Sequence, residues 1–221
     1  MESKLFTPVT FGPLTLRNRT IRSAAFESMC PGNAPSDMLL DYHRSVAAGG
    51  IGMTTVAYAA VTQSGLSFDR QLWMRPEIIP GLRRLTDAIH AEGAAAGIQL
   101  GHCGNMSHKS ICGCMPVGAS SGFNLYSPTF VRGLRADELP EMARAYGRSV
   151  NLAREAGFDS VEIHAGHGYL ISQFLSPSTN HRKDEFGGSL QNRMRFMDMV
   201  MEEVMKAAGS DMAVLVKMNM R

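Results

Sequence analysis

Short apolar runs alternate with amphipathic helical patterns along nearly the whole chain. Three of the helical patterns end at a glycine, at Gly49, Gly93 and Gly157, and an apolar run too short for a helix follows each. The sequence predicts strands at residues 20–25, 51–57, 95–100, 158–164 and 212–219, and helices that begin at Ser36 or Asp37, Pro76, Asp137 and Ser189. An unbroken alternation of this kind favours a parallel α/β fold.

Polar side chains gather where the predicted strands end, at Gln99, His102, His164, His167 and Lys217. In a (β/α)8 barrel this end of the strands carries the active site. No Gly-x-Gly-x-x-Gly run follows a strand, which disfavours a Rossmann fold. We therefore predict a TIM (β/α)8 barrel. Five strands are fewer than eight, so we expect residues 1–221 to be the N-terminal portion of the barrel, about its first five βα units.

Composition narrows the class of protein. The chain has 221 residues, a net charge of +2 and 19% charged residues, which indicates neither a nucleic-acid nor a membrane partner. No apolar stretch resembles a signal peptide or approaches the roughly 20 residues that span a bilayer. Four cysteines in a chain of this length do not indicate a disulfide framework. We expect a cytoplasmic protein.

Two histidines and a tyrosine lie together at the end of the fourth predicted strand. His164 ends the strand, and His167 and Tyr169 follow within one turn. His167 stands between Gly166 and Gly168, and Tyr169 follows Gly168. Two neutral imidazole N–H groups can hold the negative charge that develops on one substrate oxygen, and a phenol can deliver a proton. This combination suits reduction of a C=C bond conjugated to a carbonyl. No side chain carries hydride, so a cofactor must supply it.

Other interpretations of the same residues remain open. His164 and His167 are also compatible with structural histidines or with a metal site that includes His181, but no carboxylate or thiolate completes a known metal spacing. The loop at residues 101–135 is rich in Cys and His, yet Cys-x-Cys alone is a weak metal signal. We predict no metal site.

The alternation of side chains along the fourth strand places Ser160, Glu162 and His164 on one face and Val161 and Ile163 on the other. The polar face is expected to point into the barrel. An inward carboxylate is costly unless it is paired. Lys217, or an arginine outside this chain, is the expected partner of Glu162.

The stretch EIHAGHGYLISQFLSPSTNHRKDEFGGSLQNRMRF, residues 162–196, resembles the strand-4 signature of the Old Yellow Enzyme family of flavin oxidoreductases. It contains His-x-x-His-Gly-Tyr-Leu, Gln-Phe-Leu-Ser-Pro, Asn-x-Arg-x-Asp-Glu-Phe-Gly-Gly-Ser and Asn-Arg. The resemblance covers nearly the whole chain and is weakest at residues 103–135. It implies FMN as cofactor, with NADH or NADPH as hydride donor.

The resemblance also implies roles for single residues. Ala24 and Ala25 match positions where the backbone approaches the flavin, Ala60 a small residue under the ring, Gln99 an amide at the pyrimidine edge, and Lys217 a cation near the N1–C2 edge. His164 and His167 match the substrate-oxygen donors, and Tyr169 the proton donor. Asn180, Arg182 and Asp184 resemble a network that braces a loop. Phe26 and Asn105 depart from the family pattern, which affects flavin tuning and substrate contacts.

The function implied is FMN-dependent reduction of an activated C=C bond in a small-molecule substrate, such as an α,β-unsaturated carbonyl or enoate. Two alternatives stay open: a truncated barrel fragment without catalysis, and an amine dehydrogenase on the same scaffold. Larger members of the family add a [4Fe-4S] cluster after the barrel, and any cysteines that bind it would follow Arg221. A homo-oligomer is compatible with the sequence.

Overall fold

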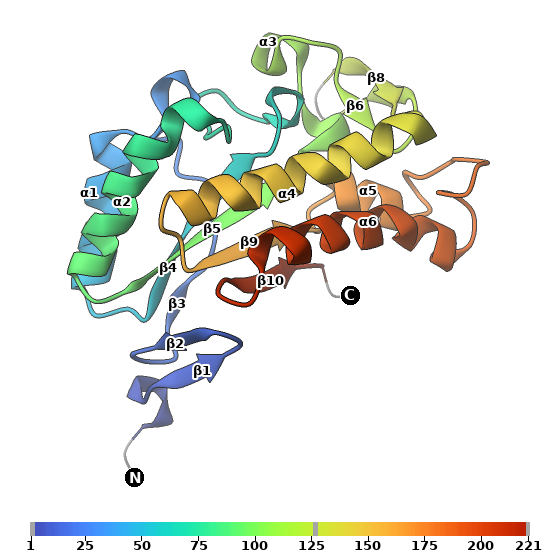
Figure 1. Ribbon diagram of the computed structural model, residues 1–221. Helices are drawn as coiled ribbons and strands as arrows, with labels where there is room; N and C mark the ends of the chain where they lie inside the picture. Colours follow the sequence, from blue (N-terminus) through green and yellow to red (C-terminus); the bar gives the residue numbers. More distant parts are fainter. Residues whose placement is uncertain (1–2, 126–127, 220–221) are drawn as a thin grey trace.

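The computed structural model describes residues 3–125 and 128–219, so the ends of the expected span 1–221 and two residues of the loop at 101–135 lie outside it (Figure 1). Its main sheet contains β3 (Ile21–Arg22), β4 (Met53–Ala60), β5 (Ala95–Gly101), β9 (Ser160–His164) and β10 (Ala213–Lys217). The long helices are α1 (Asp37–Ala48), α2 (Ile79–Ala91), α4 (Leu139–Glu155) and α6 (Leu190–Ala208), and α3 (Lys109–Cys112) and α5 (Leu170–Leu175) are short. All five predicted strands are confirmed, within a few residues.

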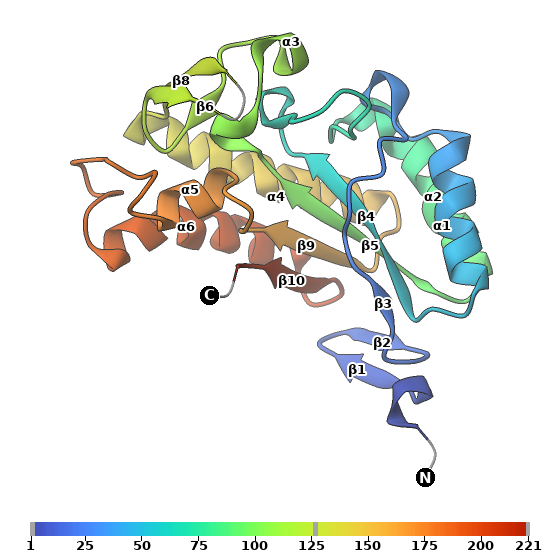
Figure 2. The same cartoon turned by 180° about the vertical axis from the view of Figure 1, so that it is seen from behind.

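The five strands form one sheet in the order β10-β9-β5-β4-β3, and all the pairings are parallel. The four long helices cover one face of this sheet, and Figure 2 shows the other face without helices. Each crossover therefore returns the chain on the same side, as in a barrel. The predicted α/β fold is confirmed as part of a TIM barrel.

The sheet curls, because residues on strands that are not neighbours touch across its inner face. Ser160 Oγ on β9 lies 3.2 Å from Met53 Sδ on β4, although β5 runs between these strands. The contact passes over Gly97 of β5, where an added Cβ would meet Ser160 Oγ at 2.9 Å and Thr55 Oγ1 at 3.2 Å. A glycine at this point of β5 thus permits the curvature.

The hydrophobic core lies between the sheet and the helices. Val161 and Ile163 are fully buried there, together with Tyr146, Val150 and Phe196 of α4 and α6. Each such side chain contributes roughly 1.5–3 kcal/mol by leaving water. The predicted alternation along β9 is therefore confirmed, with the apolar side chains toward the helices.

Lys217, one of the two predicted partners of Glu162, is wrong. Glu162 Oε1 accepts a hydrogen bond of 2.6 Å from Gln99 Nε2 on the neighbouring strand β5, in register with it. The amino group of Lys217 instead bonds the carbonyl oxygen of Ala24 at 3.1 Å. Within the described residues a neutral amide, and not Lys217, binds the carboxylate, and an arginine outside this chain stays a prediction.

Two of the predicted helix starts are confirmed by their caps. Ser36 Oγ accepts from the Leu39 N–H at 3.2 Å, and Ser189 Oγ accepts from the Asn192 N–H at 3.3 Å. Asp137 was expected to cap the helix before β9 and does not. A 3-10 turn (Ala136–Glu138) precedes α4, and the Glu138 carboxylate accepts the Arg135 N–H at 2.8 Å.

Residues 101–135, expected to be one long loop, contain further structure. They form α3 and a small sheet of β6 (Val117–Gly118), β7 (Gly122–Asn124) and β8 (Thr129–Gly133). A separate hairpin, β1 (Val9–Phe11) and β2 (Leu14–Leu16), lies at the opposite end of the sheet (Figure 1). Short strands without long apolar runs leave little signal in a sequence.

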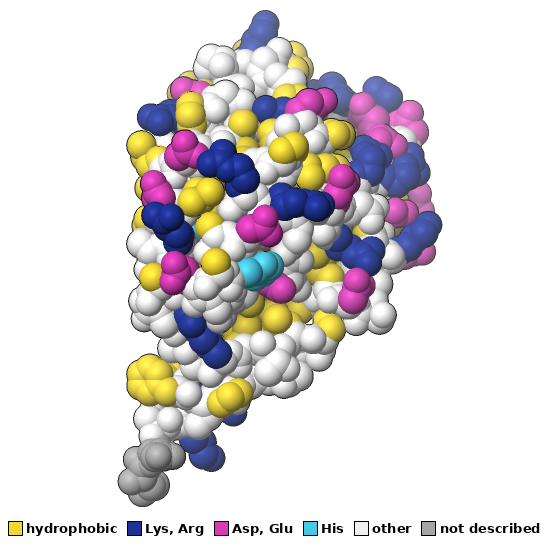
Figure 3. Space-filling model, turned by 60° about the vertical axis from the view of Figure 1, so that its left-hand side comes forward, with side chains coloured by type: hydrophobic (Ala, Val, Ile, Leu, Met, Phe, Trp, Pro, Cys, Tyr) yellow, Lys and Arg dark blue, Asp and Glu magenta, His cyan; other side chains and the backbone are white. Residues whose placement is uncertain are grey.

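The surface carries both signs of charge. Basic and acidic side chains are interspersed on the face over α1 and α2 (Figure 3). Within residues 3–125 and 128–219, no helix is both long and apolar enough to cross a membrane.

Candidate active site

His164 ends β9 and is 3% exposed. Its Nδ1 accepts the backbone N–H of Gly166 at 3.2 Å, so the ring proton lies on Nε2. Burial, together with the nearby His167 and Lys217, lowers the pKa of His164 to about 4. The imidazole is therefore neutral at pH 7, with an N–H available as a donor.

His167 follows on an exposed turn and has an unusual backbone conformation for a residue with a side chain, with φ +56°. Its N–H donates to Asn219 Oδ1 at 2.8 Å, just after β10. Gly166 packs directly against this amide, because an added Cβ would overlap with Asn219 Oδ1. The turn is thus held in place from the next strand, and the His164 and His167 ring centroids lie 4.9 Å apart.

Tyr169 completes the predicted trio. Its ring centroid lies 4.8 Å from that of His164, and the ring packs against a buried cluster that includes Ala24, Tyr58 and Ala60. Burial raises the pKa of Tyr169, while a hydrogen bond with Ser67 lowers it. The phenol therefore keeps its proton at neutral pH, as a proton donor must.

Lys217 and the end of β3 meet across the open side of the sheet. Lys217 Nζ donates to the Ala24 carbonyl at 3.1 Å, which leaves two of its three ammonium protons for another partner. Ala25 is exposed, and its carbonyl accepts from Arg22 Nη2 at 3.2 Å. A half-buried cation next to small residues suits the anionic edge of a reduced flavin.

Gln99 and Ala60 lie deeper. Gln99 is 3% exposed, and one of its two amide protons is bound to Glu162. Ala60 is fully buried, and its backbone N–H and C=O both pair with the segment 72–74. This donor set of amide, ammonium and small side chains fits a flavin. Lys217 and Gln99 would bind its polar edge, with Ala24, Ala25 and Ala60 beside the ring.

Two further residues in this region were not predicted to be part of the site. Tyr58 of β4 packs on both His164 and Tyr169, with ring centroids at 6.0 and 5.3 Å. Asn219 fixes the His167 turn. An aromatic residue in an apolar strand is indistinguishable from ordinary core by its pattern, and Asn219 lies 52 residues from His167.

The predicted loop-bracing network is confirmed. Asn180 Nδ2 donates to the carbonyls of Phe174 and Phe186, both at 2.7 Å. Arg182 bonds Asp184 through two atom pairs at 2.6 and 2.9 Å and reaches the Ala119 carbonyl at 3.0 Å. These residues tie the segment after α5 to the start of the small sheet.

The Cys- and His-rich loop does not assemble metal ligands. Among the described residues, no three His, Cys, Asp or Glu side chains are grouped as a metal site. His102 is fully buried, and burial lowers its pKa to about 3. Its two ring nitrogens bond Gly104 N–H at 2.9 Å and Ser64 Oγ at 3.1 Å, which identifies it as a structural histidine.

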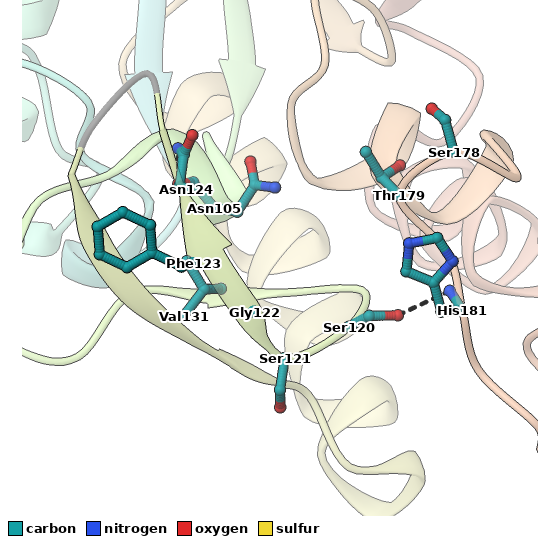
Figure 4. A pocket seen from close by; sticks show the side chains of 10 residues that line it. All are labelled: Asn105, Ser120, Ser121, Gly122, Phe123, Asn124, Val131, Ser178, Thr179 and His181. Atoms are coloured by element: carbon teal, nitrogen blue, oxygen red, sulfur yellow. Dashed lines mark hydrogen bonds between the residues drawn. The ribbon is translucent and has the colours of Figure 1, made fainter.

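A cavity of about 250 Å³ lies between the small sheet and the segment after α5 (Figure 4). Its lining is mostly polar, and Ser120 Oγ accepts a hydrogen bond of 2.9 Å from the backbone N–H of His181. His164, His167 and Tyr169 are not in this lining. The cavity therefore does not belong to the candidate active site.

Known proteins resemble the chain over nearly all of its length. It is 43% identical over 216 residues to 4,4'-dithiodibutanoate disulfide reductase of Rhodococcus erythropolis, which covers 98% of this chain and 54% of the relative. It is 37% identical over 209 residues to NADPH dehydrogenase of Bacillus subtilis, covering 92% of this chain and 60% of that protein. The chain thus spans roughly half to three fifths of these relatives.

Solved structures of related proteins share this fold. The structure of the Old Yellow Enzyme homologue from Zymomonas mobilis superimposes with a TM-score of 0.89 at 30% identity, over 97% of this chain and 63% of that chain. A family model described as NADH:flavin oxidoreductase / NADH oxidase matches residues 4–221. Together with the arrangement of His164, His167 and Tyr169, these matches show that the chain belongs to this oxidoreductase family, that of Old Yellow Enzyme.

Proposed function

We propose that the protein containing this chain uses FMN and NAD(P)H to reduce a C=C bond conjugated to a carbonyl. The observation that carries the proposal is the neutral His164, whose Nε2 proton has no partner among the described residues, next to His167 and the protonated Tyr169. Residues 1–221 would be the N-terminal portion of its flavin-binding barrel. We expect a cytoplasmic location, and a [4Fe-4S] cluster stays a prediction from the resemblance.

His164 and His167 would bind the carbonyl oxygen of the substrate and stabilise the charge that it gains as the double bond accepts hydride at the β-carbon. A bound FMN, reduced by NAD(P)H, would supply that hydride. Tyr169 would transfer its phenolic proton to the α-carbon, which completes the addition of H⁻ and H⁺ across the bond. Lys217 and Gln99 would hold the polar edge of the flavin, and Lys217 would favour its anionic reduced form.

A second candidate substrate is a disulfide. The 43% identical relative from Rhodococcus erythropolis is named for reduction of a disulfide. Reduction of an S–S bond needs the same hydride but no hydrogen bonds to a carbonyl oxygen, so it would depend less on the two histidines. Substitution of His164 should therefore lower the rate with an α,β-unsaturated carbonyl more than the rate with a disulfide.

The test begins with the purified protein and added FMN. We expect FMN to bind, its visible band to bleach under NADPH or NADH without oxygen, and the band to return when an α,β-unsaturated ketone is added. Return of the band only with a disulfide would favour the second candidate. Bleaching by an amine but not by a nicotinamide would indicate an amine dehydrogenase, and absence of FMN binding would contradict both reductase proposals.

A further inference from the structure

Two cysteines meet at the end of the short helix α3, separated by one glycine. Cys112 is the last residue of the helix and is 1% exposed, whereas Cys114 is exposed. Gly113 between them has the left-handed conformation, with φ +72°, which side chains disfavour. Its N–H donates to the Lys109 carbonyl at 2.9 Å. The glycine thus ends the helix with a turn that places the two cysteine side chains next to each other.

The two sulfur atoms are in direct contact. They lie 3.7 Å apart, and Cys112 Sγ lies 3.2 Å from the carbonyl oxygen of Cys114. A carbonyl only accepts, so the Cys112 thiol donates to it and the Cys114 thiol donates to the sulfur of Cys112. A disulfide needs about 2.05 Å between its sulfur atoms, so a gap of roughly 1.6 Å remains to be closed. Gly113 is the residue between them whose backbone adapts most readily to such a movement.

The surroundings of the two thiols differ. Cys112 packs in a buried cluster with Tyr58 and Leu66, so dissolved reagents do not reach it. Cys114 instead lines a cavity of about 520 Å³, a volume typical of sites for small organic molecules. The apolar side chains of this lining include Met115, Val117, Leu134 and Met142. An incoming molecule in the cavity therefore meets the thiol of Cys114 first.

The charged side chains of the lining bind one another. The closest pairs, at 2.6, 3.0 and 2.8 Å, are Arg132 with Glu138, Arg135 with Asp137, and Arg148 with Glu141. Each guanidinium is thus matched by a carboxylate of the same lining. A cavity of this kind favours an uncharged, partly apolar molecule.

We propose that Cys112 and Cys114 are a redox-active dithiol that exchanges with an uncharged small-molecule disulfide, R–S–S–R, bound in this cavity. The Cys114 thiolate attacks one sulfur of the disulfide, the S–S bond breaks, and the departing R–S⁻ takes up a proton equivalent to the one that Cys114 lost. Cys112 then loses its proton and attacks the Cys114 sulfur of the mixed disulfide. This step forms the Cys112–Cys114 bond and releases the second R–S⁻, which is protonated in turn.

The electrons balance without a further reactant, because two protein thiols are oxidised to one disulfide while R–S–S–R is reduced to two R–SH. Partial burial of the sulfur and its hydrogen bond with Cys112 raise the pKa of Cys114 to about 11. Little thiolate is present at pH 7, so the exchange is slow there. The same effect favours the disulfide at equilibrium, since the reduced pair gains no stability as a thiolate.

The test uses the purified protein at pH 9, without NAD(P)H, and bis(2-hydroxyethyl) disulfide as the probe. After the reaction the protein is denatured, its remaining thiols are blocked with iodoacetamide, and it is digested with trypsin. Cleavage after Lys109 and Arg132 gives one peptide, residues 110–132, that contains Cys112 and Cys114 and no other cysteine. Its mass therefore reports on this pair alone. We expect the wild-type peptide to lack two hydrogen atoms and to carry neither the probe nor a blocking group.

Serine variants separate the two roles. Cys112→Ser should keep half of the probe on Cys114 as a mixed disulfide, because no second thiol displaces it. Cys114→Ser should leave Cys112 free for the blocking reagent, because its sulfur is buried in the folded protein. Cys30→Ser is the control, since Cys30 is also buried but lies outside the cavity lining, and this variant should react as the wild type does.

A wild-type peptide with two blocked thiols, or one that still carries the probe, would overturn the proposal. Probe bound to Cys112 in Cys114→Ser would do so as well. If Cys112→Ser does not fold, the wild type and Cys114→Ser still decide the question. The exchange needs neither NAD(P)H nor His164. Exchange without C=C reduction would therefore reject only the proposed function, whereas C=C reduction without exchange would reject only this inference.

Discussion

Lys217 Nζ and the carbonyl oxygen of Ala24 lie 3.1 Å apart, although Lys217 ends one outer strand of a five-stranded sheet and Ala24 follows the other, β3. Neighbouring strands are spaced by about 4.8 Å, so in a flat sheet the edges would lie roughly 19 Å apart. The curl of the sheet brings them within reach of one side chain. The same contact places a cation at the end of the strands where a TIM barrel holds its active site.

Lys217→Met should weaken FMN binding. It removes a charge-assisted donor while keeping most of the length of the side chain, and such bonds contribute about 1.5–3 kcal/mol, which is roughly a tenfold to hundredfold change in Kd. Lys217→Arg should recover part of the loss. FMN fluorescence on titration with protein provides the measurement. Lys206→Met, at an exposed position of α6, is the control, and equal affinities of both Met variants would contradict the role of Lys217.

Much of the fold is predictable from the sequence because its strands are buried and its helices carry strong caps. Ser36 and Ser189 cap the helices that were predicted to begin there. The small sheet at β6–β8 and the 3-10 turn before α4 were missed, since they depend on short strands and on Glu138 bonding backward to Arg135. Local pattern carries little information about either.

The candidate site was predictable only where residues are close in sequence. His164, His167 and Tyr169 lie within one turn, and their rings do meet. Lys217 was wrong as the partner of Glu162 because two neighbouring strands in register placed Gln99 next to it, and strand register is absent from a single sequence. Tyr58 was not predicted to be part of the site, because the register shift between β4 and β5 at Val56–Ala59 sets the direction of its side chain.

Variants of the two histidines should separate substrate activation from flavin reduction. His164→Ala removes one of two donors to the carbonyl oxygen, and loss of one such donor lowers kcat by about 10²–10³-fold. His167→Ala should behave similarly. The rate at which NADPH bleaches the flavin should change little, because neither histidine is expected to bond the flavin. Stopped-flow absorbance resolves the two half-reactions.

The matched control for these variants is His181→Ala, since His181 is exposed and lies in the lining of a separate cavity. An enone rate in His164→Ala within threefold of the wild type would contradict the carbonyl-binding role. A disulfide rate that survives in that variant while the enone rate is lost would show that the site reduces both kinds of bond.

Folding stability should fall as the pH is lowered from 7 to 5. His102 and His164 have folded pKa values of about 3 and about 4, below the ordinary value of 6.5. Between these limits the unfolded chain binds more protons than the folded chain, so stability is retained above pH 6.5 and lost below it. Each histidine contributes a slope of at most about 1.4 kcal/mol per pH unit.

Urea unfolding at pH 5, 6 and 7 measures this slope. His102→Gln removes one titrating group and should flatten the dependence by at most about 1.4 kcal/mol per pH unit, whatever its effect at pH 7. His108→Gln changes an exposed histidine and should keep the wild-type slope. A His102→Gln slope equal to that of the wild type would show that burial of His102 does not hold it neutral.

Gly166→Ala should impair the site with only a small loss of stability. The new methyl group would overlap with Asn219 Oδ1 and break its bond to the His167 N–H, which measures 2.8 Å. A lost backbone bond costs about 1 kcal/mol. The His167 turn, at φ +56°, would lose the contact that holds it, so the enone kcat should fall far more than stability does.

Asn219→Ala tests the same bond without the overlap and should give a similar loss of kcat. Gly122→Ala serves as the control, because a Cβ there meets nothing within 4 Å and φ is ordinary. Enone kinetics and urea unfolding of the three variants decide the matter. If Gly166→Ala slows turnover and Asn219→Ala does not, the glycine is needed for space alone. If both do, the hydrogen bond from β10 to the His167 turn keeps His167 in position to bind the substrate oxygen.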